Sequence, residues 1–159
     1  MQKRWTYRKT SGEYETISAM IESVFKSSIA PLYPPEGVSF FLDYIKPDKL
    51  SARRAGGNIS YLAVDHTENK PVGFIEGRTP SHICLLFVDE SCRKQGIAKT
   101  LVSHLIRHFW DKDPNLKAIT VHASPNAVEA YAAMGFVPDG KESVENGIRY
   151  LPMKKKLTK

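Results

Sequence analysis

The sequence lacks any long hydrophobic run. Its longest apolar stretch is Ile83 to Val88, far shorter than the roughly 20 apolar residues that cross a bilayer as a helix. Residues 1–15 carry basic side chains but no apolar segment behind them, unlike a secretory signal. We therefore expect a cytoplasmic protein with no membrane partner.

Cysteine is scarce in this chain. Its two cysteines, Cys84 and Cys92, do not form a C-x-x-C motif. No cluster of histidine and cysteine has the spacing of a metal site. A reduced protein with no bound metal is the simplest interpretation.

Two common nucleotide-binding motifs are also missing. The phosphate-binding loop GxxxxGK[ST] and the dinucleotide pattern GxGxxG occur nowhere in the chain. Proteins built on those two loops are therefore excluded.

Positive charge is concentrated at one end of the chain. The net charge is +6 over 159 residues, and four of these charges belong to Lys154, Lys155, Lys156 and Lys159. Other basic residues are scattered, and no helix-turn-helix, zinc-finger or RNP pattern accompanies them. Nucleic acid is therefore not the expected partner. Binding of nucleic acid or of an acidic protein through this tail stays an alternative.

The stretch from His82 to Val102 organises the rest of the chain. Its apolar residues 83–88 favour a buried strand, and apolar residues recur at helical spacing from Ile97 onward. Between them lies a basic loop in which Gly96 lets the backbone approach a ligand closely. The first turn of a helix offers free N–H groups and partial positive charge, so the loop predicts an anion site. A tight turn that binds nothing is the alternative.

Two motifs resemble those of the GNAT superfamily of N-acetyltransferases. The acetyl-CoA loop of that family, R/Q-x-x-G-x-G/A, is matched by Arg93-Lys94-Gln95-Gly96-Ile97-Ala98. A second family pattern, N-x-x-A-x-x-x-Y-x-x-x-G-F, is matched in looser form through Asn126, Ala130, Tyr131, Gly135 and Phe136. The two matches occur in the order that the family has.

The expected order of elements is also that of the GNAT fold. Periodicity and turn signals predict a strand at 5–9, a helix with its stripe at 17–29, an ordered loop at 31–40, a short helix closing before Pro47, strands at 59–65, 71–78 and 83–88, a helix from 97, a strand at 118–124, a short helix ending at Gly135 and a hairpin around Asn146-Gly147. The resemblance implies a single α/β (α+β) domain over residues 1–159. Its mixed, mostly antiparallel and twisted sheet would have about six or seven strands and about four flanking helices, in a monomer or homodimer.

The resemblance also implies an activity and its residues. GNAT enzymes transfer an acetyl group directly from acetyl-CoA to a primary amine, here of an unidentified acceptor. Tyr131 takes the position of the general acid that protonates the leaving thiolate, provided that the site lowers its phenol pKa modestly from about 10. The residues expected to contact the cofactor are Leu86, Phe87, Val88, Arg93, Lys94, Gln95, Gly96, Ile97, Ala98, Lys99, Asn126 and Tyr131.

The general base and the acceptor contacts stay open at this stage. His82 begins the strand on which some family members carry a histidine or glutamate base, and an ordinary imidazole pKa of about 6.5 suits that role. His122 and Glu76 are the competing candidates. Together with Tyr33 and Glu36 from the loop over the acceptor side, these two are also candidate acceptor contacts. A catalytically inactive acyl-CoA-binding or sensing domain is the alternative function, although the presence of Tyr131 argues against it.

Overall fold

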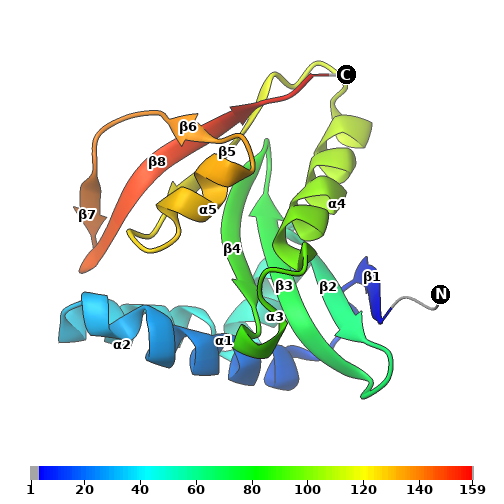
Figure 1. Ribbon diagram of the computed structural model, residues 1–159, viewed down its shortest axis with the longest axis vertical. Coiled ribbons are helices and arrows are strands. Elements are labelled where there is room, and N and C mark those ends of the chain that lie inside the picture. The colour runs from blue at the N-terminus through cyan, green and yellow to red at the C-terminus, as the bar shows by residue number, and fades with distance from the viewer. Residues whose placement is uncertain (1–3, 159) are drawn as a thin grey trace.

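The computed structural model describes residues 4–158, which form an eight-stranded sheet (Figure 1). The strands are β1 (Trp5–Lys9), β2 (Ile59–Asp65), β3 (Lys70–Arg78), β4 (His82–Val88), β5 (Ala118–Ala123), β6 (Val137–Pro138), β7 (Ser143–Glu145) and β8 (Ile148–Lys156). Their order is β1-β2-β3-β4-β5-β8-β6, with β7 paired to β8. All neighbours run antiparallel except β4 and β5, which are parallel.

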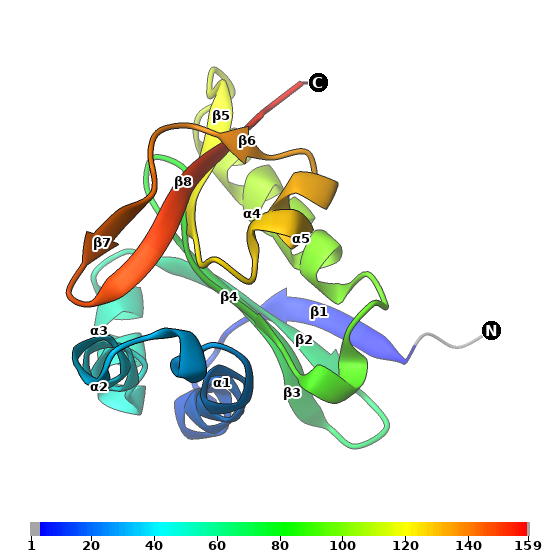
Figure 2. The same ribbon diagram turned by 60° about the vertical axis from the view of Figure 1, so that its left-hand side comes forward.

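Helices cover both faces of the sheet (Figures 1 and 2). They are α1 (Tyr14–Ser28), α2 (Pro35–Tyr44), α3 (Pro47–Ala55), α4 (Ile97–Lys112) and α5 (Val128–Ala133), with short 3₁₀ turns at Ala30–Leu32 and Glu90–Cys92. Within residues 4–158, no helix combines the length and the apolar character needed to span a bilayer.

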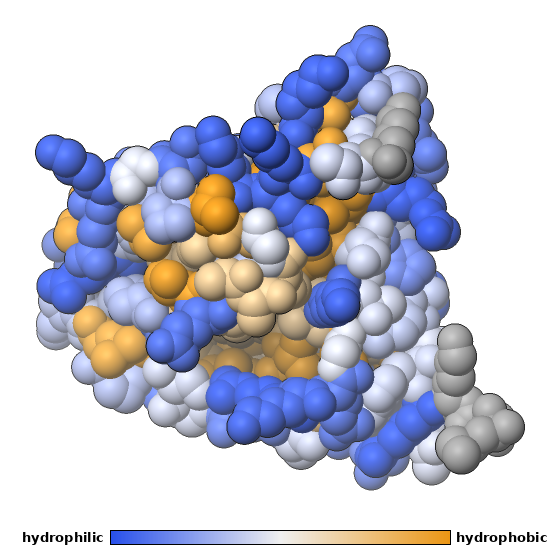
Figure 3. Space-filling view, turned by 45° about the horizontal axis from the view of Figure 1, so that its top comes forward, coloured by the Kyte–Doolittle hydropathy of each residue, from blue (hydrophilic) through white to orange (hydrophobic). Residues whose placement is uncertain are grey.

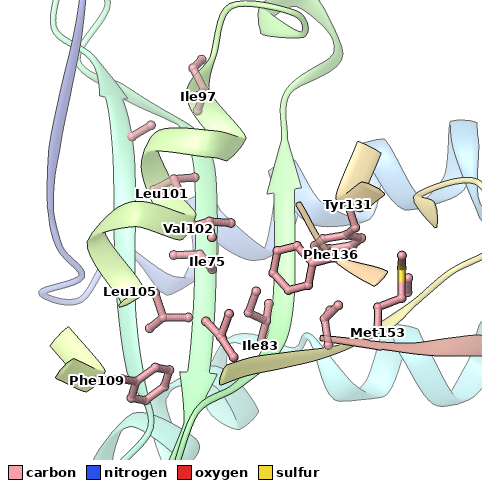
Figure 4. Packing of buried hydrophobic residues seen from close by; sticks show 14 of the residues in the cluster. Ile75, Ile83, Ile97, Leu101, Val102, Leu105, Phe109, Tyr131, Phe136 and Met153 are labelled. Carbon is pink, nitrogen blue, oxygen red and sulfur yellow. The ribbon is translucent and has the colours of Figure 1, made fainter. Parts of the chain in front are cut away.

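Each face of the sheet has its own hydrophobic core. On one face α4 contacts β2, β3 and β4, and the apolar stripe of α4 packs against the strands together with Tyr131 and Phe136 (Figure 4). On the other face α1 contacts β3 and β4 through Ile17, Ile21 and Phe25. The sheet is therefore held between two buried layers.

A register shift in the middle of the sheet changes the face to which the side chains of β4 point. Between β3 and β4, Gly77 pairs with Ile83 and Glu76 pairs with Leu85, so Cys84 is an extra residue with no partner. Because of this bulge, Ile83 belongs to the α4 core while Leu85 belongs to the α1 core, although a regular strand would put both on one face.

The pairing of β4 with β5 ends at the same place. It covers only His82 with Thr120 and Ile83 with Val121. Beyond this point the two strands separate, and the two parts of the sheet diverge (Figure 2). One edge of β4 from Cys84 onward therefore has no strand beside it among the described residues.

The structure confirms the predicted class and the mostly antiparallel mixed sheet, and it corrects the region after α1. The predicted loop at 31–40 contains the start of α2, and the entire helix α3 was not predicted. Pro35 and Pro47 are the first residues of these two helices, where a missing N–H costs nothing. Pro35 thus begins a helix within the predicted loop, and Pro47 begins a new helix where the sequence predicted only the end of one. The short strand β6 accounts for the eighth strand.

Close packing of α4 on β3 requires glycine in that strand. A Cβ built on Gly77 would lie 2.8 Å from Leu105 Cδ2 and 3.0 Å from Phe109 Cζ, both of which are in the buried α4 core. On Gly56 at the end of α3, the nearest atom would be 3.5 Å away. A methyl group therefore fits at Gly56 and not at Gly77.

We predict that Gly77→Ala lowers the free energy of unfolding by about 1–3 kcal/mol, the usual cost of overpacking a core. The matched variant Gly56→Ala should stay within about 0.5 kcal/mol of the parent. Urea unfolding of the three proteins measures both differences. Equal stabilities of Gly77→Ala and the parent would show that α4 can move away from β3 without cost.

Candidate active site

A cavity of about 1020 Å³ lies where β4 and β5 separate. Its walls come from β4, the loop before α4, α5, the α1–α2 segment and the hairpin of β7 and β8. Figure 3 shows a recess with apolar side chains on this face of the molecule, surrounded by hydrophilic residues. Residues from both sequence motifs therefore line the same cavity.

The loop before α4 presents backbone N–H groups to one end of this cavity. Lys94 and Gly96 both have left-handed backbone angles, with φ of 63° and 80°. Gly96 caps α4, whose first intrahelical bond runs from Thr100 N to Gly96 O, so the preceding N–H groups of the first turn are free. Because nothing lies within 4 Å of a Cβ built on Gly96, the loop is open toward a ligand.

Basic side chains surround this helix start. Arg93, Lys94 and Lys99 all line the cavity, and Arg93 Nη2 donates to Ser28 Oγ at the end of α1 over 3.1 Å. Free N–H groups, the partial positive charge of the helix and these cations favour a bound anion of several charges.

The free edge of β4 forms the next part of the wall. Leu86, Phe87 and Val88 line the cavity, and past Ile83 this edge carries backbone groups with no strand to pair with. An extended ligand can add to such an edge through main-chain hydrogen bonds. The edge leads from the basic loop toward the start of β4.

Tyr131 lies on α5 across the cavity from this edge. It is 7% exposed, and its ring packs edge-on against Phe136 with centroids 5.3 Å apart (Figure 4). Burial raises the pKa of Tyr131, which is opposite to the modest lowering that the sequence argument required. Asn126, just before α5, also lines the cavity, and its Oδ1 accepts a hydrogen bond from Ser124 Oγ at 2.8 Å.

A chain of four polar and aromatic side chains forms the opposite end of the cavity. His82 and His122 meet edge-on with ring centroids 4.7 Å apart, and His122 stacks on Tyr150 at 4.2 Å. The Tyr150 hydroxyl donates to Glu145 Oε1 over 2.8 Å. All four residues line the cavity. They come from β4, β5, β8 and β7, so only the folded sheet brings them together.

The two imidazoles in this chain have different surroundings. His82 Nδ1 hydrogen bonds with Thr120 Oγ1 at 2.8 Å, and burial, with Arg78 and His122 nearby, lowers the pKa of His82 to about 4. Burial and Arg78 also lower the pKa of His122, but the Glu145 carboxylate opposes that change. The side chain of His122 is exposed on the cavity surface.

Tyr33 lines the cavity as predicted, whereas three other predicted contacts do not. Glu76 is 2% exposed and its carboxylate is taken by Arg53 Nε at 2.8 Å and Asn58 Nδ2 at 2.8 Å, so a role as base or acceptor contact is wrong. Glu36 is exposed on α2 and Gln95 is exposed in the basic loop, both outside the cavity lining.

Arg78, Glu145 and Tyr150 line the acceptor end of the cavity and were not predicted from the sequence. Arg78 ends β3 opposite His82, and Tyr150 and Glu145 lie on the last hairpin. The Asn146-Gly147 turn predicted that hairpin but gave no sign that it reaches β4. Arg78 is the last residue of a mostly apolar strand, and an arginine at a strand end is ordinarily solvated.

The chain belongs to the GNAT acetyltransferase family. The family model described as acetyltransferase (GNAT) domain matches residues 29–157, which include both motifs and the whole cavity wall from Ile29 onward. Peptidyl-lysine N-acetyltransferase YjaB of Salmonella typhimurium is 34% identical over 79 residues, or 50% of this chain and 51% of that protein. The match thus spans about half the length of that relative.

Solved structures share the fold over nearly the whole chain. The GCN5-related N-acetyltransferase of Rhodopseudomonas palustris has a TM-score of 0.78 at 23% identity, covering 99% of this chain and 98% of its own. The PaiA N-acetyltransferase of Thermoplasma acidophilum, in complex with coenzyme A, has a TM-score of 0.77 at 18% identity, covering 98% and 100%. The predicted GNAT fold is therefore confirmed.

Proposed function

We propose that this protein transfers an acetyl group from acetyl-CoA to a primary amine. The observation that carries this proposal is the shared cavity of the α4 start, with its left-handed Lys94 and Gly96, and the unpaired edge of β4. One feature suits a pyrophosphate and the other suits an extended amide-containing arm. The coenzyme A in the complex of the structural relative supports the same assignment.

The chain fits acetyl-CoA along one continuous path. Arg93, Lys94, Lys99 and the first turn of α4 would hold the phosphates, and the main chain of residues 86–88 would pair with the pantetheine arm. The thioester would then lie between Tyr131 and the histidine pair. When bound, acetyl-CoA supplies the acetyl carbon to which the C–N bond forms as the C–S bond breaks.

We predict that Gly96→Glu weakens acetyl-CoA binding by about 100-fold or more, because it places a carboxylate beside the phosphates. The matched control is Gly12→Glu, another exposed glycine with positive φ and nothing within 4 Å of a built Cβ. Isothermal calorimetry on both folded variants makes the comparison. Unchanged affinity in Gly96→Glu would place the phosphates elsewhere.

Tyr131 is the proposed proton donor to the departing sulfur. Its hydroxyl stays protonated because burial raises its pKa, and a thiolate leaving in the same apolar surroundings also becomes a stronger base. Tyr131 therefore donates a hydrogen bond to the developing thiolate and then its proton. The packing against Phe136 holds the ring in position for this step.

Tyr131→Phe keeps this packing and removes only the hydroxyl. We expect acetyl-CoA affinity and stability to hold while the chemical step slows by roughly 10²–10⁴-fold. Single-turnover acetyl transfer is the proper measurement, since product release can limit steady-state rates. Tyr61→Phe, which removes a hydroxyl outside the cavity lining, is the control. If Tyr131→Phe turns over at the wild-type single-turnover rate, Tyr131 only packs and is not the proton donor.

The histidine pair is the proposed route for the proton of the amine. A pKa of about 4 makes His82 a poor proton acceptor near neutral pH, and its bond to Thr120 fixes the orientation of the ring. His122 is exposed and has Glu145 nearby to favour its charged form. His122 is therefore assigned as the base and His82 as the residue that positions it and the amine.

His122→Gln should slow single-turnover transfer at pH 7 by about 100-fold, the lower range for general base catalysis, and His82→Gln by less. The pKa of His122 is lowered from its ordinary value, so the imidazole should stay neutral to a pH somewhat below 6.5. The rate of acetyl transfer should therefore persist to that pH as well. Rates measured from pH 5 to 9 with one acceptor test both points. A larger loss in His82→Gln than in His122→Gln would reverse the two roles.

A further inference from the structure

One cation at the acceptor end of the cavity has no acidic partner. Arg78 lines the cavity with an exposed side chain, and its Nη1 donates a weak hydrogen bond to Cys84 Sγ at 3.9 Å. No carboxylate of residues 4–158 forms an ion pair with it. The nearby Arg53, by contrast, is paired with the buried Glu76.

The positive charge of Arg78 acts on the aromatic rings that line this end of the cavity with it. Its positive charge contributes to lowering the pKa values of His82 and His122, and it acts on Tyr44 as well. The acid of this wall, Glu145, already accepts the hydroxyl hydrogen of Tyr150. This end of the cavity therefore combines aromatic walls with one free guanidinium, a group that binds carboxylate or phosphate oxygens in a fork geometry.

The same end of the cavity is closed on one side by the last hairpin. Gly147 in the β7–β8 turn lies so close to α2 that a Cβ built on it would be 2.6 Å from Gly37 N. The Tyr33 hydroxyl donates to Arg149 O over 3.4 Å. Figures 1 and 2 both show the tip of the hairpin beside α2. This contact limits the space for an acceptor that continues as a polypeptide in both directions.

We infer that the acceptor is a small amino acid, whose carboxylate is bound by Arg78 while its amine faces His122 and its side chain packs among the aromatic rings. This inference rests on the proposed acetyl transfer and specifies its second substrate. The chemistry that Arg78 recognises is an oxyanion beside an amine, which an aminophosphonate shares. A polycationic amine would instead meet a positive charge with no acidic cluster to balance it.

The test compares acceptors built on one carbon skeleton. Thiol release from acetyl-CoA is measured with the twenty amino acids, then with the best of them against its amide, its decarboxylated amine and its aminophosphonate. An end-blocked peptide with an internal lysine completes the series. The amino acid should exceed its amide and its decarboxylated amine by about 10–100-fold in kcat/KM, the range for losing a hydrogen-bonded charge pair.

Arg78→Gln should reduce that preference by about 10–100-fold, mainly through KM for the amino acid. Arg107→Gln, an exposed arginine on α4 outside the cavity lining, is the matched control and should keep the preference. Calorimetry with acetyl-CoA shows whether Arg78→Gln retains the cofactor site.

Three results would overturn the inference while acetyl transfer stands. They are a better rate with the decarboxylated amine or the lysine peptide, a better rate with the aminophosphonate, or an unchanged preference in Arg78→Gln. Failure of the parent protein to bind acetyl-CoA would instead overturn the proposed function itself. The two failures are thus distinguished by the calorimetric measurement.

Discussion

The structure of this site depends on one irregularity, the extra residue Cys84 in β4. The bulge moves the following side chains of β4 to the opposite faces, and β4 loses β5 as its neighbour at the same point. A continuous sheet would have paired the edge of β4 and filled the space beside it. Because the pairing stops after Ile83, the protein keeps a row of unpaired backbone groups facing a cavity. Such an edge is costly in a buried position, and a ligand that pairs with it removes that cost.

The position of α4 links this edge to the basic loop. Gly73 and Gly77 leave room for the side chains of α4 to lie directly on β3, and this close approach fixes where the helix begins. The first turn of α4 then faces the cavity with Gly96 at its cap. Positive charge at this end and the free arginine at the other end leave an apolar middle region. This division matches the proposed function, in which the cavity holds a polyanion at one end, a thioester in the middle and an acceptor at the other end.

Local patterns predicted the part of the site that lies on one continuous segment. The strand, the loop and the helix between residues 82 and 102 were recognisable because apolar spacing and one glycine define them locally. The helices that begin at Pro35 and Pro47 were not predicted at those positions. Proline is found both after the end of a helix and in its first turn, and the local sequence does not distinguish the two cases. Glu76 was named as a competing base because it is an acidic residue within an otherwise apolar strand, and its partners Arg53 and Asn58 lie far from it in the sequence. The bulge in β4 was also not predicted, because it exists only in the pairing of two strands and no spacing within either strand reveals it.

The hydrogen bonds of Glu76 with Arg53 and Asn58 also explain why Arg78 is available to a ligand. Glu76 is buried, and burial of a carboxylate is favourable only with partners that compensate its charge, which Arg53 and Asn58 provide. The guanidinium of Arg53 also lies 3.7 Å from the ring centre of Tyr44, so this buried pair holds an aromatic wall of the cavity in place. With Glu76 engaged on the α3 side, Arg78 is left as a second arginine at the end of the same strand without a carboxylate. One arginine therefore stabilises the wall, and the other remains free to bind an anion from solution.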